Sequence, residues 1–419
     1  MQSTELASGR QIDARIACAP RRRIVILNQA FYPDVVSTAQ HATDLALALV
    51  DAGYAVTVVT GARAYDNPGR QFPPREHYRE IEIIRVAATA FGKTAPWRRA
   101  ADFATYLANC ALRMALLRRC DLVIAMTSPP LISWLASLMV PLKARNLLFW
   151  AMDLNPDEAI AAGWLRPRSF AGRALSALLL QSMRRARRII ALDRFMKERM
   201  IAKGVPAEKI AVVPPWAHDT VRFDAAAREQ FRARHGLSGK FVVMYSGNHS
   251  PCHPLDTVVE AARRLADDPR FVFCFVGGGS EYRRLQLLAR QRQTDNVVFL
   301  PYQPLEELGA SLSAADLHVV VMGDPFVGII HPCKIYNVLR VGAPVLYIGP
   351  ASSHITDIFD AMQGAQFRAA RHGDVPEVVT LIRAAAGDPA QRTVQIKFAD
   401  RFSHQVLVTN MLNIVQATL

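Results

Sequence analysis

FVFCFVGGGSEYRRLQLLARQ, residues 271–291, decides the fold. The segment joins a short apolar strand to three glycines and then to a helical pattern. Glycines permit close approach of another backbone or of a ligand, and the amides at the start of a helix favour an anionic group. A tight turn without a ligand is the alternative. Tyr282 stands where the third glycine of a GxGxxG motif would be, so a nicotinamide dinucleotide site is disfavoured.

The same alternation of short apolar runs and helical patterns continues along the chain from Arg23. It is typical of a parallel sheet with helices on both faces. The first series has expected strands at 24–27, 56–60, 81–86, 122–125, 147–150 and 188–191, with helices at 39–52, 99–117, 131–143 and 173–184. A second series has expected strands at 241–245, 271–276, 297–300, 317–321 and 344–347.

Adjacent prolines at Pro214 and Pro215 separate the two series and fit a linker. We therefore predict an α/β protein with two doubly wound Rossmann-like domains facing a cleft. The expected parts are a flexible segment at 1–20, a first domain at 21–213, a linker at 214–225, a second domain at 226–400 and a C-terminal helix at 401–419, whose return to the first domain stays open. Ligands of such sheets bind beyond the carboxyl ends of the strands, so function should lie in the loops there.

Positive charge is concentrated in the first half of the chain. The net charge of the 419 residues is +14, and residues 1–218 hold about 30 Lys and Arg against about 17 Asp and Glu. The densest stretch, 166–188, places arginines around the apolar run 174–180. This pattern predicts either a helix with a basic rim that lies on an anionic membrane or a solvated helix with a buried stripe.

The sequence also predicts several absences. No segment has the roughly 20 apolar residues that span a bilayer, and the N-terminal segment lacks the apolar core of a signal peptide. We expect a cytoplasmic protein, with peripheral attachment to the inner face of the cell membrane as an open alternative. The six cysteines form no CxxC pair, and there is no Asp-x-Asp motif. We therefore expect no disulfide, metal, cofactor or nucleic-acid partner.

Two polar stretches follow strands of the second series. Gly247, Asn248 and His253 come after the expected strand 241–245. Further along, Pro332 suits the first turn of a helix and places Lys334 near its positive end. A cation gains nothing from the helix dipole there, so the sequence predicts an anionic partner for Lys334. A solvated lysine is the alternative.

Two carboxylates follow the expected strand 147–150 of the first series. Asp153 and Asp157 lie in a short polar loop within otherwise apolar sequence. They could orient the hydroxyls of an acceptor molecule or accept a proton. Capping of the next helix is the alternative, and it suits Asp157 better because Asp153 lies nearer the strand.

Taken together, these residues resemble the family 4 retaining glycosyltransferases of the GT-B fold. The resemblance runs from Arg23 to about Leu412 and is strongest to the bacterial subgroup that builds colanic acid, capsule and O-antigen sugars, including the N-acetyl-fucosamine transferases. Six segments in order carry it: NQAFYPD at 28–34, TSPP at 127–130, WAMDLNPD at 150–157, SGN at 246–248, VGGGSE at 276–281 and PCKIYN at 332–337.

The resemblance implies a nucleoside diphosphate sugar held by the second domain and a polyprenyl-linked or saccharide acceptor held by the first. Metal-independent hexosyl transfer with retention would follow, with Lys334 and Asp153 as the catalytic residues. The sugar donor would meet Gly247, Asn248, His253, Gly277, Gly278, Gly279, Ser280, Glu281, His331 and Asn337. The acceptor would meet Tyr32, Ser37, Thr38 and Asp157. Glu281 has helix capping as its alternative role.

The chain departs from the family pattern at the sugar-donor site. Both carboxylates of the usual Glu-x7-Glu motif are absent, because Asn337 and Ile329 stand in their places. Asn248 and His253 replace the usual Arg and Lys after the first strand of the nucleotide domain. Two other functions therefore stay open: a GT-B sugar-nucleotide epimerase, and an inactive nucleotide-sugar-binding assembly protein.

Overall fold

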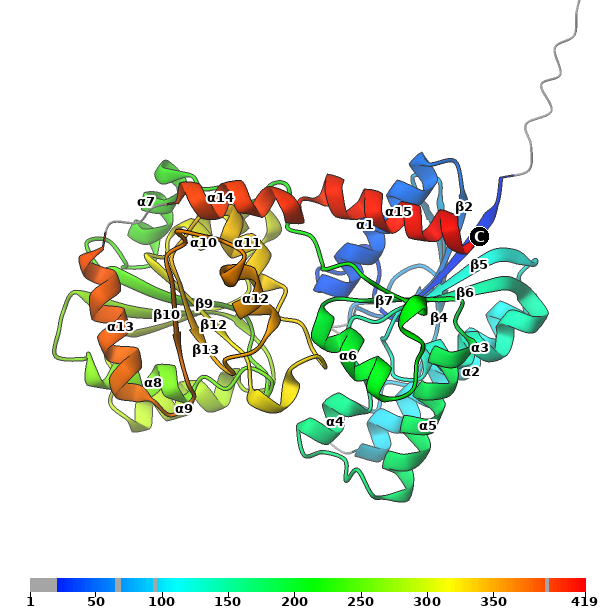
Figure 1. Cartoon of the computed structure of the whole chain (residues 1–419), viewed down its shortest axis with the longest axis horizontal. Coiled ribbons are helices and arrows are strands. Elements are labelled where there is room, and N and C mark those ends of the chain that lie inside the picture. The colour runs from blue at the N-terminus through cyan, green and yellow to red at the C-terminus, as the bar shows by residue number, and fades with distance from the viewer. Residues whose placement is uncertain (1–20, 65–68, 93–95, 389–391) are drawn as a thin grey trace, which may run out of the picture.

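The computed structural model describes residues 21–64, 69–92, 96–388 and 392–419. The expected flexible segment at 1–20 lies outside these residues. Within them the chain forms two α/β domains joined by a linker after Val212 (Figure 1). The prediction of two doubly wound domains is confirmed.

The first domain is built on an eight-stranded sheet with the order β3-β4-β2-β1-β5-β6-β7-β8. Every neighbouring pair is parallel except β3 and β4, which are antiparallel. The central strands are almost fully buried because helices cover both faces. The strands are β1 Arg23–Leu27, β2 Ala55–Gly61, β3 Arg75–Tyr78, β4 Ile81–Val86, β5 Cys120–Ala125, β6 Ala144–Trp150, β7 Arg188–Ala191 and β8 Ile210–Val212. The helices are α1 Ser37–Asp51, α2 Pro96–Leu116, α3 Ile132–Lys143, α4 Asp157–Ala161, α5 Phe170–Arg185 and α6 Arg194–Ala202.

The second domain has a six-stranded, all-parallel sheet with the order β11-β10-β9-β12-β13-β14. Its strands are β9 Phe241–Asn248, β10 Phe271–Gly278, β11 Val297–Leu300, β12 Leu317–Val321, β13 Val345–Ile348 and β14 Phe367–Ala370. Its helices are α7 Ala225–Arg234, α8 Asp256–Arg264, α9 Tyr282–Gln291, α10 Leu308–Ser313, α11 Lys334–Arg340, α12 His354–Asp360, α13 Val375–Gly387 and α14 Thr393–Ala399.

The carboxyl ends of the two sheets face each other. Leu154, after β6, donates its amide hydrogen to Ile329, after β12, at 2.9 Å. Asp193, after β7, contacts His331 across the same junction. In each sheet the strand order reverses once, between β1 and β5 and between β9 and β12. Ligands of open parallel sheets bind at such reversals, so both binding crevices open toward the space between the domains.

The last helix returns to the first domain. Figure 1 shows α14 over the second domain and α15, His404–Thr418, continuing over the first, where it packs on α1. Leu407, Met411 and Val415 enter the core of the first domain. Asn146 of β6 donates its side-chain amide to the carbonyl oxygen of Thr418 at 2.8 Å.

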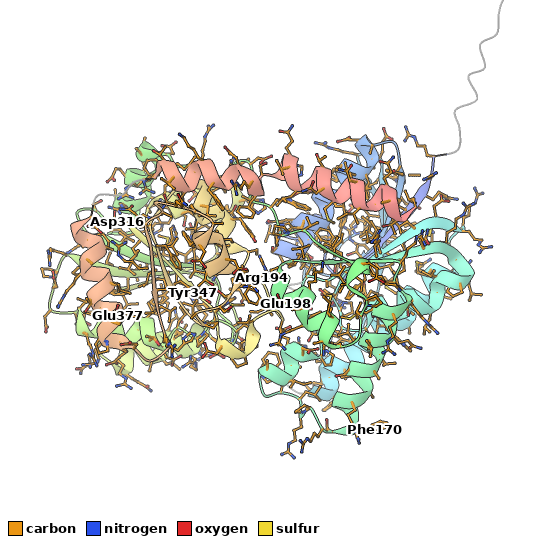
Figure 2. The ribbon with its side chains drawn as sticks, viewed as in Figure 1. Phe170, Arg194, Glu198, Asp316, Tyr347 and Glu377 are labelled. Carbon is orange, nitrogen blue, oxygen red and sulfur yellow. The ribbon has the colours of Figure 1, made fainter. Side chains whose placement is uncertain are left out.

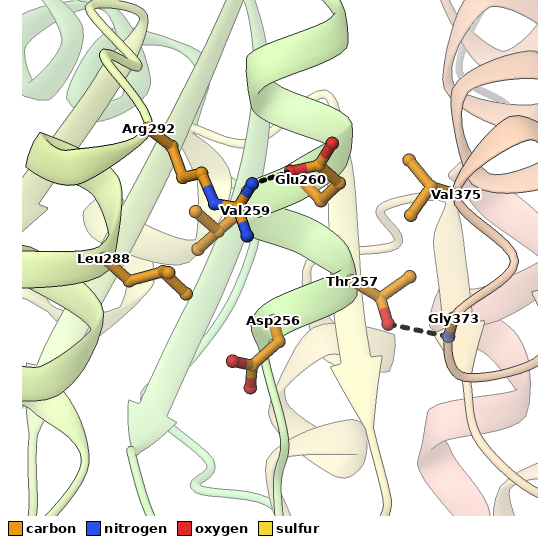
Figure 3. Close-up of a pocket in the computed structure, with 8 residues that line it drawn as sticks. All are labelled: Asp256, Thr257, Val259, Glu260, Leu288, Arg292, Gly373 and Val375. Carbon is orange, nitrogen blue, oxygen red and sulfur yellow. Dashed lines mark hydrogen bonds and ion pairs between the residues drawn. The ribbon is translucent and has the colours of Figure 1, made fainter.

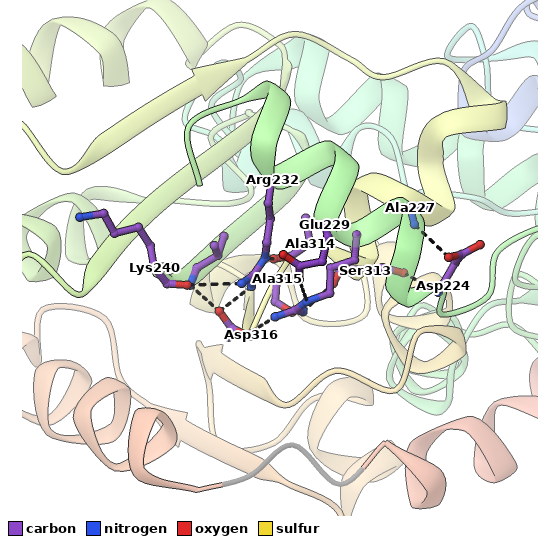
Figure 4. Close-up of polar contacts among 11 residues, drawn as sticks. Asp224, Ala227, Glu229, Arg232, Lys240, Ser313, Ala314, Ala315 and Asp316 are labelled. Atoms are coloured by element: carbon purple, nitrogen blue, oxygen red, sulfur yellow. Dashed lines mark hydrogen bonds and ion pairs between the residues drawn. The ribbon is translucent and has the colours of Figure 1, made fainter. Parts of the chain in front are cut away.

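The opposite, amino end of the second sheet is held by a charge network (Figure 4). Asp316 accepts hydrogen bonds from Arg228 and Arg232 of α7, each at 2.6 Å, and from the amide of Val242 at 2.7 Å. The Arg232 side chain is only 7% exposed. Each buried charge here therefore has a partner, as stability requires.

The sequence analysis missed three strands, and each of them lies at an edge of its sheet. They are β3 and β8 at the two edges of the first sheet and β14 at one edge of the second. An edge strand pairs on one side only, so it is often short and less apolar. The sequence REHY of β3 and the three residues of β8 carry no strand pattern of their own.

Candidate functional site

Three glycines let the ends of β9 and β10 approach each other. A Cβ on Gly277 would lie 2.1 Å from the carbonyl oxygen of Gly247, and one on Gly279 would lie 2.3 Å from the Asn248 side chain. Gly247, Gly277 and Gly279 have φ angles of +138°, +131° and +130°, which residues with a side chain rarely adopt. The approach of two protein loops thus requires these glycines. Beyond them, Ser280 is exposed at the turn.

Lys334 lies buried beside this loop. Its Nζ would be 3.0 Å from a Cβ on Gly247 and is 3.5 Å from the centroid of the Tyr245 ring. The buried Nζ has no hydrogen-bond partner among the described residues. Burial lowers the pKa of Lys334 to about 7, because loss of water disfavours the ammonium form. An ammonium on an aromatic face without a counter-ion is a site that an anion would complete.

Two histidines near Lys334 carry no charge at neutral pH. His253 Nδ1 lies 2.8 Å from the carbonyl oxygen of Val321. Burial, followed by the charge of Lys334, lowers the pKa of His253 to about 3. The same two causes lower the pKa of His249 to about 4. Of these three groups, Lys334 is therefore the one that an anion would neutralise.

Three other candidate residues of the second domain make contacts within the protein. Glu281 precedes α9 but does not cap it, and its carboxylate pairs with Arg284. A Cβ on Gly278 would meet the ring of Tyr302 at 3.0 Å. Asn337 accepts a hydrogen bond from the amide of His218 at 2.9 Å, so its side-chain oxygen is engaged by the linker.

His331 connects the domains. Its Nδ1 lies 2.7 Å from Asp193 Oδ2 and its Nε2 lies 2.6 Å from the hydroxyl of Tyr336. Asp193 is the N-cap residue of α6 in the first domain, where its other oxygen accepts from the amide of Met196. Burial acts against the charge of Asp193, but the hydrogen bond and charge of His331 keep its pKa below the usual value.

Asp193, His331 and His354 form the one cluster of possible metal ligands found among the described residues. The two imidazole rings stack, with centroids 3.8 Å apart and planes at 25°. Metal-bound imidazoles approach an ion from different directions, which parallel stacked rings cannot do. The cluster therefore fits an interdomain contact better than a metal site.

Asp153 and Asp157 have different surroundings. Asp153 follows β6 and accepts a hydrogen bond from Asn155 at 3.0 Å. Burial, together with the charge of Glu158, raises the pKa of Asp153 to about 7. Asp157 forms an ion pair with Lys203, directly after α6, at 2.7 Å and does not cap α4. Asp157 is thus held in an ion pair, whereas Asp153 has only a hydrogen bond from a neutral amide.

The remaining candidates of the first domain follow β1. Ser37 opens α1, and its Oγ lies 3.4 Å from the sulfur of Cys333, next to Lys334. Thr38 is half-buried in the first turn of the same helix. The Tyr32 ring stacks on Tyr78 with centroids 3.8 Å apart.

The structure thus brings part of the predicted site together. Ser37 reaches the PCKIYN segment, and Asp153 lies in the loop whose Leu154 bonds to Ile329 of the second domain. Asp157, Glu281 and Asn337 are engaged by other protein groups. Sequence reasoning missed Asn155, Glu158 and Asp193. Their signal was available, because each lies in a loop or helix directly after a parallel strand.

A surface depression of about 390 Å³ lies elsewhere, between α8, α9 and the start of α13 (Figure 3). It contains Asp256 and Glu260, which pair with Arg284 and Arg263. None of the predicted site residues lines it. Its carboxylates are already paired with arginines, so we do not place the sugar donor there.

Two parallel-sheet domains with apposed carboxyl ends and a buried lysine between them define the class of GT-B proteins. The first domain matches the model of the Glycosyl transferase 4-like domain over residues 38–216. The second matches the model named Glycosyl transferases group 1 over residues 227–325. The two ranges together cover well over half of the chain, which belongs to the family 4 glycosyltransferases.

Relatives and solved structures agree with this assignment. The putative colanic acid biosynthesis glycosyl transferase WcaI of Escherichia coli is 32% identical over 214 residues, which span 50% of this chain and 52% of WcaI. The match thus covers about half the length of that relative. Sucrose-phosphate synthase from Thermosynechococcus elongatus superposes with a TM-score of 0.75 at 17% identity, over 95% of this chain and 99% of that one. Anabaena HepE in complex with UDP-glucose superposes with a TM-score of 0.70 at 14% identity, over 95% and 100%.

No helix in the described part of the chain is both long and apolar enough to cross a membrane.

Proposed function

We propose that this protein transfers a hexosyl unit, with an N-acetylamino sugar as one candidate, from a nucleoside diphosphate sugar to an acceptor in the synthesis of a surface polysaccharide. The observation that carries the proposal is Lys334, whose buried Nζ has no counter-ion in the part of the chain that the structure describes and lies at the junction of the domains. The colanic acid relative supports the pathway class. The neighbour HepE, solved with UDP-glucose, supports the class of sugar donor.

Lys334 is the group that would stabilise the leaving diphosphate. Negative charge grows on the diphosphate oxygen as the bond to the anomeric carbon breaks. A cation already fixed at that place lowers the barrier without reorganisation. The Tyr245 ring beneath its Nζ limits the positions that the ammonium group can take. No cofactor or metal enters this scheme.

The acceptor would lie on the first domain, against Asp153, Ser37 and Tyr32. The acceptor hydroxyl attacks the anomeric carbon, the new glycosidic bond forms, and the electron pair of the old bond leaves with the diphosphate. Asp153 would hold that hydroxyl in attacking geometry. Retention at the anomeric carbon is part of the proposal and comes from the family resemblance. A polyprenyl-linked sugar or a free saccharide would fit the acceptor role.

The two other functions are less well supported. A sugar-nucleotide epimerase would act on the sugar donor alone, and an inactive binding protein would have no use for a carboxyl group with a pKa of about 7 beside the cleft. Asn337 stands in the place of one Glu-x7-Glu carboxylate, and its side-chain oxygen is held by the linker. The contacts to the sugar and ribose would therefore differ from those of the usual motif.

A membrane surface is the proposed location of the acceptor. The turn before α5 and the first residue of that helix expose Trp164 and Phe170, with 57% and 84% of each residue accessible, beside the exposed Arg166, Arg168 and Arg173. Figure 2 shows Phe170 at the outer tip of the first domain. Aromatic rings beside arginines suit the headgroup region of an anionic bilayer. The apolar run expected at 174–180 contributes instead to packing, since Leu179 is buried.

Three measurements test these proposals. Thermal stabilisation by a panel of UDP-, GDP- and dTDP-sugars should identify a preferred sugar donor. Transfer from that donor to a polyprenyl diphosphate-linked sugar should follow, whereas epimer formation without an acceptor, or binding without turnover, would contradict it. Binding to phosphatidylglycerol vesicles should exceed binding to phosphatidylcholine vesicles and fall with salt. Equal binding by a Trp164→Ala, Phe170→Ala double variant would exclude that tip as the membrane contact.

A further inference from the structure

Asp153 has a second carboxylate beside it, which belongs to Glu158 of α4. The side-chain amide of Asn155 donates to Asp153 Oδ1 and to Glu158 Oε2, each at 3.0 Å. One amide group thus bridges two carboxyl groups. In the described residues, no lysine, arginine or histidine lies within ion-pair distance of either one.

The pair lies where the two domains meet. Leu154, between Asp153 and Asn155, bonds to Ile329 of the second domain. The thiol of Cys252, in the loop after β9, lies 3.8 Å from Glu158 Oε1. The neighbouring Asp157 points to Lys203 instead. Of these two consecutive residues of α4, Asp157 forms an ion pair within the first domain, whereas Glu158 reaches the second domain.

Two carboxyl groups that share one amide donor repel each other when both are charged. Burial, followed by the charge of Glu158, raises the pKa of Asp153 to about 7, whereas the hydrogen bond from Asn155 lowers it. Cys252 also lies near the pair, and burial followed by Glu158 raises its pKa to about 12, so it stays a neutral thiol. Asp153 therefore holds its proton to nearly neutral pH, and the charge of Glu158 contributes to this.

We propose that Glu158 is a positioning residue for the transfer reaction, acting through Asn155 on Asp153, and that Asp153 takes up the proton of the acceptor hydroxyl. This inference rests on the proposed function. As the hydroxyl oxygen bonds to the anomeric carbon, its O–H bond breaks and the proton passes to Asp153. The bond from the anomeric carbon to the diphosphate breaks on the same face of the sugar, as retention requires, and its electron pair leaves with the diphosphate. Asp153 returns the proton to water when the product departs.

The test compares two substitutions that should act in opposite directions. Glu158→Gln removes a negative charge, so the acidic limb of the kcat/KM profile against pH should move down by about one unit or more. Asn155→Ala removes a stabilising hydrogen bond, so the same limb should move up. A purely structural role would lower activity in both variants without moving the limb in opposite directions. Glu229→Gln on the surface of α7 is the matched control, because Glu229 is exposed and far along the chain from the site.

A second readout does not need transfer. Infrared spectra of the carboxyl band, taken as the difference between the wild type and Asp153→Asn, should show one group titrating near pH 7 and shifting down in Glu158→Gln. An unshifted titration in a folded Glu158→Gln variant overturns the inference; if that variant does not fold, an unshifted Asn155→Ala titration does so. If the titration shifts but the rate profile does not, the pair exists and its part in transfer is refuted. If the wild type transfers no sugar, the proposed function fails independently of the titration.

Discussion

At the two ends of the second domain's sheet, buried charged groups differ in whether they have an ion-pair partner. At the amino end, Asp316 is matched by Arg228 and Arg232. At the carboxyl end, Lys334 is buried with no partner among the described residues. The first arrangement stabilises the fold, and the second weakens it until an anion arrives. The contrast supports the proposal that the carboxyl end of the sheet is the functional end.

The strongest test of this contrast is Asp316→Ala. It leaves Arg232, 7% exposed, without a counter-charge among the described residues, and leaves Arg228, 14% exposed, with Glu229 alone, so the free energy of unfolding should fall by about 3 kcal/mol. Urea denaturation measures this loss. Asp388→Ala, which breaks an ion pair at a carboxylate 55% exposed, should cost less than about 1 kcal/mol. Equal losses in the two variants would show that the Asp316 network contributes no more to the unfolding free energy than an exposed ion pair does.

Lys334→Met should separate stability from function. The substitution keeps the length of the side chain but removes the unpartnered charge, so the unfolding free energy should rise. Transfer should fall by roughly 10² or more, on the scale of one lost electrostatic stabiliser. Denaturation and steady-state kinetics at saturating substrates measure the two effects. Unchanged transfer would refute the role of Lys334, and a loss of stability would show that its charge is compensated in the free protein.

Binding of UDP should draw a proton onto the protein. The pKa of Lys334 is about 7 in the free protein, so at pH 8 its amine is mostly neutral, and a bound diphosphate favours the charged form. Calorimetry in buffers of different ionisation enthalpy should therefore detect uptake of close to one proton at pH 8 and little from this group at pH 6. The Lys334→Met variant should lose the uptake at pH 8, and persistence of that uptake would assign it to another group.

Asp153 has intermediate surroundings, because it has a hydrogen-bond partner but, within the described ranges, no counter-ion. Its pKa of about 7 in the folded state exceeds the usual value of 3.8, so it stabilises the protein at low pH, and this stability is lost as pH rises toward 7. Asp153→Asn should remove that dependence. Relative to the wild type, the variant should gain more than about 1 kcal/mol between pH 5 and pH 8 in denaturation experiments. A constant difference across that range would show that Asp153 is ionised throughout.

The sequence predicts features that depend on residues close together in the chain, but not those that depend on distant ones. Each central strand and the glycine turn at 277–279 could be predicted, because apolar runs and glycines report local conformation. The position of Lys334 at a helix start could also be predicted, since Pro332 precedes it. Its lack of a partner could not, because that depends on Tyr245 and Gly247, far away in the chain.

The first domain shows the same limit more sharply. Asp157 and Glu158 are adjacent carboxylates, and the sequence analysis named Asp157 as an acceptor residue without considering Glu158. Only the folded chain brings Lys203, which follows α6, to Asp157 and leaves Glu158 to Asn155. Likewise, the engagement of Asn337 by His218 depends on the path of the linker. Motif spacing cannot reveal which of two neighbouring side chains another element will pair with.

The returning helix α15 sets an order of events during synthesis. The first domain leaves the ribosome first, yet Met411 and Val415 belong to its core. A ribosome adds about 5–20 residues per second, so the roughly 190 residues between β8 and α15 take on the order of ten seconds or more. The second sheet is complete at Ala370, before α15 exists. The core of the first domain is therefore completed after the second sheet. The apolar side chains of α1 that pack on α15 stay exposed to other chains until α15 emerges.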